Sequence, residues 1–128
     1  MGNLRPFVAV VDDDESVGRA IKRLLRSAGI GADTFSSGDD FLDMLSSMPS
    51  YSPGCVILDI QMPGLNGLEV QRRLNGSGMP VILITAYDDM GVRAQALASG
   101  AVAYLRKPFN DSILIKTVQT ALGIAPAP

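Results

Sequence analysis

The stretch that decides the fold runs Cys55-Val56-Ile57-Leu58-Asp59-Ile60-Gln61-Met62-Pro63-Gly64-Leu65-Asn66-Gly67. Its first four residues are apolar, which is typical of a strand buried on both faces of a parallel sheet. Asp59 follows this run directly and precedes a segment rich in turn-forming residues. Its carboxylate is therefore expected at a surface cleft, where it can accept a metal ion or a phosphoryl group.

Three other apolar runs also end in polar residues. These are Phe7 to Val11 with Asp12-Asp13, Val81 to Ile84 with Thr85, and Tyr104-Leu105 with Lys107. Taken singly, each ending has a simpler explanation: acids in the first turn of a helix, a turn-initiating Asp, a strand-closing Thr or a solvated Lys. Taken together, an acid pair, a lone Asp, a hydroxyl and an ammonium at strand ends favour a phosphorylation site.

The composition restricts the class of protein. A chain of 128 residues with 47% hydrophobic and 19% charged residues suits one globular domain. Its net charge of -2 and scattered Lys and Arg residues do not favour a nucleic-acid surface. The single cysteine, Cys55, cannot form an internal disulfide, and no apolar stretch approaches membrane-spanning length. We therefore expect a cytoplasmic domain without a signal peptide.

Predicted strands and helices alternate along the chain. Strands are predicted over residues 7–11, 32–35, 55–58, 81–84 and 102–105, with the second near a sheet edge. A helix is predicted after each strand, with Gly29 ending the first helix and Asp111 capping the last. This order indicates right-handed βαβ units and a parallel sheet covered by helices. Ligands of such sheets bind beyond the carboxyl ends of the strands, where the polar endings lie.

The chain resembles the receiver domain of bacterial two-component response regulators over about residues 6–123. The residues that carry the resemblance are Val11-Asp12-Asp13, Asp59 with Met62-Pro63 and Gly67, Thr85-Ala86, Gly100-Ala101 and Tyr104-Leu105-Arg106-Lys107-Pro108-Phe109. The resemblance implies a flavodoxin-like α/β fold, a doubly wound parallel (βα)5 sheet in strand order 2-1-3-4-5 with helices on both faces. Residues 1–123 would form this domain, and residues 124–128 a Pro/Ala linker-like tail.

The resemblance also implies roles for the acidic residues. Asp59 would be the phosphoacceptor, whose carboxylate attacks the phosphorus of a phosphohistidine on a partner protein. Asp13, Asp59 and the backbone carbonyl of Gln61 would hold Mg²⁺ or Mn²⁺. Asp12 would act on the metal through a bound water. Such hard cations prefer oxygen ligands and keep waters that a phosphate can replace.

A second set of implied roles concerns the response to phosphorylation. Lys107 and Thr85 would bind phosphoryl oxygens, and Tyr104 would turn inward as Thr85 moves. The face made by the fourth helix, fifth strand and fifth helix would change with them. Gln61 and Tyr87 would flank the route of hydrolytic water, and the bulk of Tyr87 predicts slow self-dephosphorylation.

The implied partners are proteins. Because the chain contains no histidine, the phosphoryl donor would be a sensor histidine kinase or a histidine phosphotransfer protein. The switching face would act on an output domain or effector, and phosphorylation could promote a dimer. We expect no turnover of an external substrate, no nucleic-acid binding and no membrane contact. The resemblance also implies a cis bond between Lys107 and Pro108.

Three alternatives come from other classes of protein. A phosphorylation-independent receiver would serve only as a binding module, although such variants typically lose a key residue and this chain keeps them all. A Mg²⁺-dependent phosphatase with an aspartate nucleophile would need a cap and a nucleophile after the first strand. A flavin-carrying domain would need a phosphate-cradling loop where this chain has the acidic run from Asp12 to Glu15.

Overall fold

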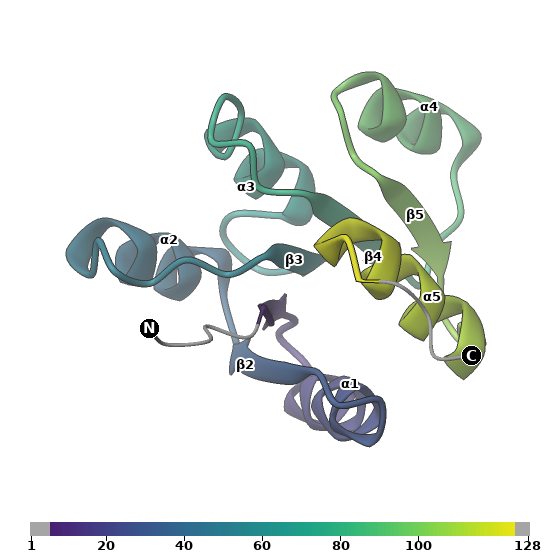
Figure 1. Ribbon diagram of the computed structural model, residues 1–128. Helices are drawn as coiled ribbons and strands as arrows, with labels where there is room; N and C mark the ends of the chain where they lie inside the picture. Colours follow the sequence, from purple (N-terminus) through teal and green to yellow (C-terminus); the bar gives the residue numbers. More distant parts are fainter. Residues whose placement is uncertain (1–5, 125–128) are drawn as a thin grey trace.

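Strands and helices alternate through the computed structural model, which describes residues 6–124 (Figure 1). The elements are β1 (Phe7–Val11), α1 (Glu15–Ser27), β2 (Gly31–Phe35), α2 (Gly38–Ser47), β3 (Cys55–Asp59), α3 (Gly67–Arg73), β4 (Val81–Thr85), α4 (Met90–Ala98), β5 (Ala103–Arg106) and α5 (Asp111–Leu122). The tail predicted for residues 124–128 lies, except for Ile124, outside the described residues.

The strands form one parallel sheet in the order β2-β1-β3-β4-β5, which confirms the predicted flavodoxin-like fold. The strand order reverses at β1. The chain first adds β2 on one side of β1 and then adds β3 on the other side. β2 is an edge strand, as its more polar sequence predicts, and β3 and β4 are buried along their whole length. The strand-order reversal places the ligand-binding edge near β1 and β3.

Helices cover both faces of the sheet (Figure 1). On one face, α1 and α5 contribute Ile21, Leu25, Leu114 and Val118 to a core with the even-numbered positions of β1 and β4. On the other face, α2, α3 and α4 contribute Phe41, Val70 and Ala96 to a second core. The two cores arise because successive side chains of a strand point to opposite faces.

Several predicted boundaries are wrong by one residue. β2 begins at Gly31, and β3, β4 and β5 end at Asp59, Thr85 and Arg106, each one residue beyond the prediction. The last helix is capped by Asn110 rather than Asp111, because the Asn110 side chain accepts hydrogen bonds from the backbone N–H groups of Ser112 and Ile113. Asp111 is instead the first helical residue, where its charge still favours the helix N-terminus. The fifth strand begins at Ala103, since Val102 lies in a bend and is 53% exposed.

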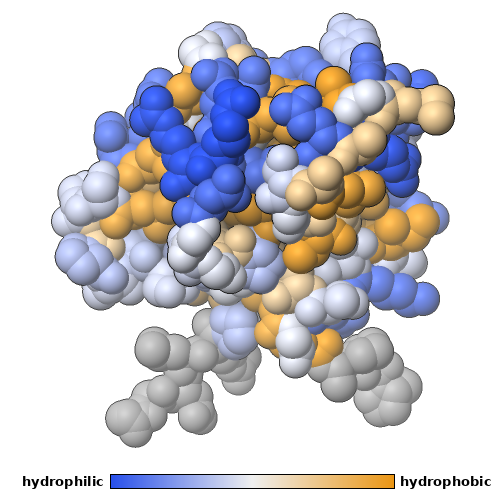
Figure 2. Space-filling view, turned by 90° about the horizontal axis from the view of Figure 1, so that it is seen from above, coloured by the Kyte–Doolittle hydropathy of each residue, from blue (hydrophilic) through white to orange (hydrophobic). Residues whose placement is uncertain are grey.

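The outer surface is mixed in polarity. Figure 2 looks onto the side that carries α3 and α4, where hydrophobic residues are visible between hydrophilic ones. Six large apolar side chains of the described residues are exposed, among them Tyr87, Met90, Leu97, Val102 and Ile113. Within residues 6–124 no helix combines the length and apolar character needed to cross a bilayer.

Candidate functional site

The site lies at the carboxyl ends of four neighbouring strands. Asp59 is the last residue of β3 and Thr85 the last of β4. Asp12 follows β1 directly, and Lys107 follows β5 directly. Because all strands are parallel, these ends share one edge of the sheet. The fold thus brings together residues that are up to 95 positions apart in the chain.

Three carboxylates form an acidic cluster at this edge. Asp12, Asp13 and Asp59 each place one oxygen within 4.8 Å of the others. Asp12 and Asp59 are buried, with exposed fractions of 2% and 4%, whereas Asp13 is exposed. The Asp12 carboxylate also accepts a 2.9 Å hydrogen bond from the backbone N–H of Asp14, which fixes its orientation.

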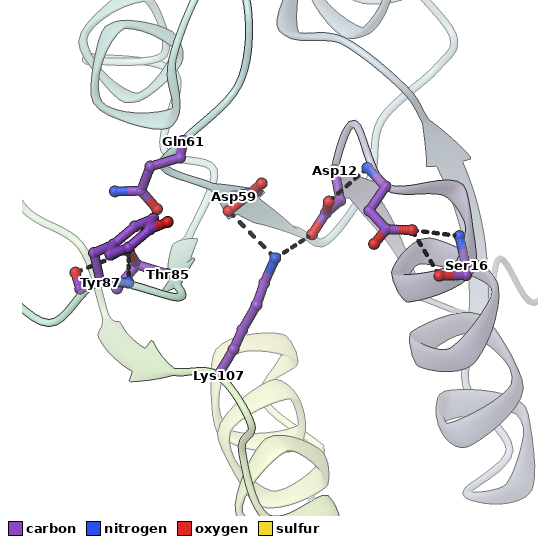
Figure 3. Close-up of polar contacts among 8 residues, drawn as sticks. Asp12, Ser16, Asp59, Gln61, Thr85, Tyr87 and Lys107 are labelled. Carbon is purple, nitrogen blue, oxygen red and sulfur yellow. Dashed lines mark hydrogen bonds and ion pairs between the residues drawn. The ribbon is translucent and has the colours of Figure 1, made fainter.

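Lys107 is the cation that neutralises this cluster (Figure 3). Its Nζ atom lies 2.9 Å from Asp12 and 3.4 Å from Asp59. Although burial lowers the pKa of Lys107, its hydrogen bond and charge interaction with Asp12, assisted by Asp59, raise it overall. The bond from Lys107 to Pro108 is cis, as the resemblance to receiver domains implied.

The carboxyl group of Asp59 has a raised pKa. Burial of its carboxylate, together with the negative charge of Asp12 and Asp13, raises its pKa to about 6, and Lys107 opposes this rise. At neutral pH the carboxylate is still mainly ionised, so it remains a competent nucleophile or ligand. It is also held in surroundings that favour neutralisation of its charge, by a proton, a cation or a covalent bond.

Thr85, Gln61 and Tyr87 form a separate polar group beside Asp59 (Figure 3). The Thr85 hydroxyl is fully buried and lies 2.7 Å from the Gln61 side-chain oxygen. The backbone N–H of Tyr87 donates a 3.0 Å hydrogen bond to the same hydroxyl. The Tyr87 ring is 71% exposed, so it stands at the surface next to this group.

Tyr104 faces the interior. Its side chain is 5% exposed and joins the core beneath α4, where its hydroxyl has no hydrogen-bond partner among the described residues. The guanidinium of Arg93 on α4 lies 5.5 Å from the centre of the Tyr104 ring, within the range of a cation–π contact. Tyr104 therefore packs between β5 and α4.

The loop after Asp59 closes tightly. The Gly67 backbone N–H donates a 3.1 Å hydrogen bond to the Ile60 carbonyl. A Cβ atom on Gly67 would lie 2.5 Å from the backbone oxygen of Asp59, so glycine is required for this approach. The Asn66 side chain and Glu69 form a capping box that starts α3 at this point. The loop thereby holds the backbone that carries Asp59.

The residues present fit a hard divalent cation. Three carboxylates converge and two of them are buried. Among the described residues only Lys107 compensates them, so an added cation would relieve their repulsion. All the available donors are oxygens, which suits Mg²⁺ or Mn²⁺ rather than a soft metal. Cys55 is buried in the core on β3, where burial raises the pKa of its thiol to about 12, and it takes no part in the site.

Sequence reasoning missed two features beside the site. One is the contact between the Gln61 side chain and Thr85, which joins residues 24 positions apart. The other is a groove of about 790 Å³ between α1 and the segment after β5, with a mainly apolar lining that includes Val17, Leu24, Lys107 and Phe109. The apolar pattern of α1 could have signalled the groove, but no local pattern specifies the Gln61 contact.

Comparison with known proteins identifies the family. The family model for the response regulator receiver domain matches residues 8–119. The chain belongs to this family. Response regulator protein TmoT of Ectopseudomonas mendocina is 36% identical, across 98% of this chain and 57% of TmoT. Transcriptional regulatory protein FixJ of Bradyrhizobium diazoefficiens is 37% identical, across 90% of this chain and 56% of FixJ. This receiver domain thus spans slightly more than half the length of these curated relatives.

Solved structures agree with the family assignment. A crystal structure of a response regulator receiver protein from Burkholderia phymatum is 69% identical with a TM-score of 0.89, and the match covers 97% of this chain and all of that one. The structure titled FixJ-N is 28% identical with a TM-score of 0.82 and covers 98% of this chain. The protein is therefore a receiver domain of a two-component system. Receiver domains are signalling proteins and are generally not classical enzymes.

Proposed function

We propose that this receiver domain is a phosphoacceptor switch in which Asp59 takes a phosphoryl group from a phosphohistidine. The single observation that carries the proposal is the position of the Asp59 carboxylate, at the end of β3, within 3.4 Å of Lys107 and beside two further acids. The donor is a sensor histidine kinase or a histidine phosphotransfer protein, because the chain has no histidine of its own.

In the transfer, a carboxylate oxygen of Asp59 forms a bond to phosphorus. The phosphorus–nitrogen bond of the donor breaks, and the histidine nitrogen leaves with the electron pair. Lys107 would move from pairing with carboxylates to pairing with a phosphoryl oxygen, and the Thr85 hydroxyl would donate to another. Phosphoryl transfer of this kind depends on positioning and charge neutralisation rather than on other covalent chemistry.

Mg²⁺ or Mn²⁺ would be held by Asp13, Asp59 and the backbone carbonyl of Gln61, with Asp12 acting through a water. When bound, the ion supplies positive charge to the phosphoryl oxygens. The ionised Asp59 carboxylate that Lys107 holds is the group that this chain contributes to bond formation. The acidic cluster and its oxygen donors support this assignment.

The groove beside Lys107 is the proposed approach for the donor. A protein that delivers phosphohistidine must cover the surface next to Asp59, and the groove between α1 and the segment after β5 opens there. Its mainly apolar lining suits a helix of the donor that carries the histidine. A Leu24→Glu substitution in this groove should slow transfer from a histidine donor without slowing phosphorylation by acetyl phosphate.

The phosphorylated state would be read on the face of α4, β5 and α5. Movement of Thr85 toward the phosphoryl group would alter the packing of Tyr104 and thereby the position of α4. Leu97 on α4, Val102 before β5 and Ile113 on α5 are exposed apolar residues of these elements and suit contact with an output domain, an effector or a second copy.

Tyr87 and Gln61 would limit the entry of water to the phosphoaspartate. The bulky Tyr87 ring at the surface beside Thr85 supports slow self-dephosphorylation. Phosphorylated Tyr87→Ala protein should therefore lose its phosphate faster than the wild type. Equal lifetimes in the two proteins would remove Tyr87 from this role.

The decisive experiment is incubation with Mg²⁺ and acetyl phosphate, followed by intact-mass measurement. We expect a labile adduct of one phosphoryl group in the wild type and in Asp88→Asn, which changes an exposed acid outside the site. Asp59→Asn should give none. Absence of the adduct in the wild type, with no response to beryllofluoride, would favour a phosphorylation-independent binding module.

A further inference from the structure

The Thr85 hydroxyl already has a hydrogen-bond acceptor in this structure. Its oxygen lies 2.7 Å from the Gln61 side-chain oxygen and 3.0 Å from the Tyr87 backbone oxygen. A hydroxyl has only one proton to donate, and the shorter contact is the one to Gln61. The Tyr87 backbone N–H, at 3.0 Å, donates to the hydroxyl and occupies one of its lone pairs.

The proposed function requires this same proton. In the phosphorylated domain the Thr85 hydroxyl would donate to a phosphoryl oxygen on Asp59, and an oxygen atom of a phosphoryl group cannot serve as donor in return. The bond from Thr85 to Gln61 must therefore break before the bond to the phosphoryl group forms. The two acceptors are alternatives for one donor.

We propose that the side-chain amide of Gln61 competes with the phosphoryl group for the Thr85 proton and so sets how readily the domain switches. Gln61 is then a positioning residue that acts through its side chain on Thr85. This role is distinct from metal binding by its backbone carbonyl and from control of water entry. The inference rests on the proposed function of Asp59 and Thr85.

Burial explains why the competition is effective. Thr85 is fully buried, so its hydroxyl cannot turn to bulk water and must donate to an acceptor beside it, of which the Gln61 side-chain oxygen is nearer than the Tyr87 backbone oxygen. Gln61 is exposed, so its amide returns to water when the bond breaks. The net value of such a hydrogen bond is about 1 kcal/mol, which corresponds to roughly a five-fold change in an equilibrium constant.

The test uses beryllofluoride with Mg²⁺ as the probe, because it imitates a phosphoryl group without being hydrolysed. The complete chain, labelled with ¹⁵N, is titrated while the backbone amide signals of Thr85 and Tyr87 are followed. Gln61→Met keeps a similar side-chain length and removes the acceptor. We expect half-saturation of Gln61→Met at about a five-fold lower beryllofluoride concentration than for the wild type.

Two comparisons separate the hydrogen bond from other effects. Gln95→Met changes an exposed glutamine on α4 and should titrate like the wild type. In a Thr85→Val background, which lacks the proton, Gln61→Met should leave the half-saturation concentration unchanged.

The outcomes are distinct. The proposed competition would be wrong if Gln61→Met lowered the half-saturation concentration five-fold in the Thr85→Val background as well. It would also be wrong if Gln61→Met, with Thr85 present, had the same half-saturation concentration as the wild type. If wild-type protein does not respond to beryllofluoride at all, the proposed function fails instead. An altered dephosphorylation rate without altered beryllofluoride affinity would assign Gln61 to water entry alone.

Discussion

The ammonium of Lys107 donates a 2.9 Å hydrogen bond to the carboxylate of Asp12, which lies 95 residues earlier in the chain. The same ammonium lies farther from Asp59, at 3.4 Å. Asp12 is buried and Lys107 is 20% exposed, so the contact is shielded from solvent. In this structure Lys107 thus primarily compensates Asp12 and leaves the proposed nucleophile less tightly paired.

Replacing Lys107 should reveal the charge repulsion that it suppresses. In Lys107→Met, Asp12 and Asp59 lose their only compensating side chain among the described residues, and we expect the free energy of unfolding to fall by about 2 kcal/mol. Urea denaturation at neutral pH with a chelator measures this loss. Mg²⁺ should restore part of it. Lys116→Met, at an exposed position of α5, should change stability by less than about 0.5 kcal/mol.

The raised pKa of Asp59 predicts a pH-dependent stability. Its pKa is 3.8 as a reference and about 6 in the folded protein, so the folded state binds more protons between these values. Ionised Asp59 therefore destabilises the fold above about pH 6, and this penalty disappears as the pH falls toward 4. Without metal, Asp59→Asn should be more stable than the wild type by about 2 kcal/mol at neutral pH.

Urea denaturation of both proteins with a chelator, at about pH 7.5 and about pH 5, measures this difference. The advantage of Asp59→Asn should shrink at the lower pH, because the wild-type carboxyl becomes protonated there. An advantage that stays constant across this range would contradict the raised pKa of Asp59. Titrating groups that do not interact with Asp59 are common to both proteins and cancel in the comparison.

The buried hydroxyl of Tyr104 should cost stability. It has no hydrogen-bond partner among the described residues, so Tyr104→Phe removes an unpaired polar atom and keeps the ring packed beneath Arg93. We expect the free energy of unfolding to rise by about 1 kcal/mol. Tyr51→Phe is the matched comparison, because its hydroxyl donates to Asp33 and its removal should lower stability. Destabilisation by Tyr104→Phe would show that solvent or another group satisfies the hydroxyl.

Gly67 should tolerate no side chain. In Gly67→Ala the new methyl group would lie 2.5 Å from the Asp59 backbone oxygen and 3.0 Å from the Ile60 Cα atom, so backbone must move. We expect a loss of about 2 kcal/mol in stability and slower formation of the acetyl phosphate adduct. In Gly91→Ala the nearest atom is a flexible Asp89 side-chain oxygen at 3.3 Å, so this control should label at the wild-type rate.

The sequence predicted the fold because its local patterns agree with one another. Apolar runs, helical stripes and turn residues located all five strands and all five helices, with errors of one residue at β2, β3, β4 and β5 and at the last cap. The errors have a local cause: Asn110 and Asp111 are both good capping residues, and only the backbone path decides which side chain meets the free N–H groups.

Tertiary structure alone decided the burial and pairing of polar residues. Gln71 would be expected on a solvated helix face, yet it is 3% exposed and donates a 3.1 Å hydrogen bond to the Ala96 carbonyl of α4. Lys107 could have paired with either acid, and the Gln61 side chain could have remained in solvent. These choices depend on distances between elements that no local spacing encodes.

The sequence by itself therefore determined the alternating α/β order and which side chains reach the carboxyl edge of the sheet. Side-chain periodicity and turn chemistry are local properties, and parallel strands bring their carboxyl ends together. Only the tertiary structure decided that Lys107 bonds most closely to Asp12 and that Thr85 bonds to Gln61. Hydrogen bonds form over about 3 Å, a precision that is fixed by the packing of the whole sheet and its helices.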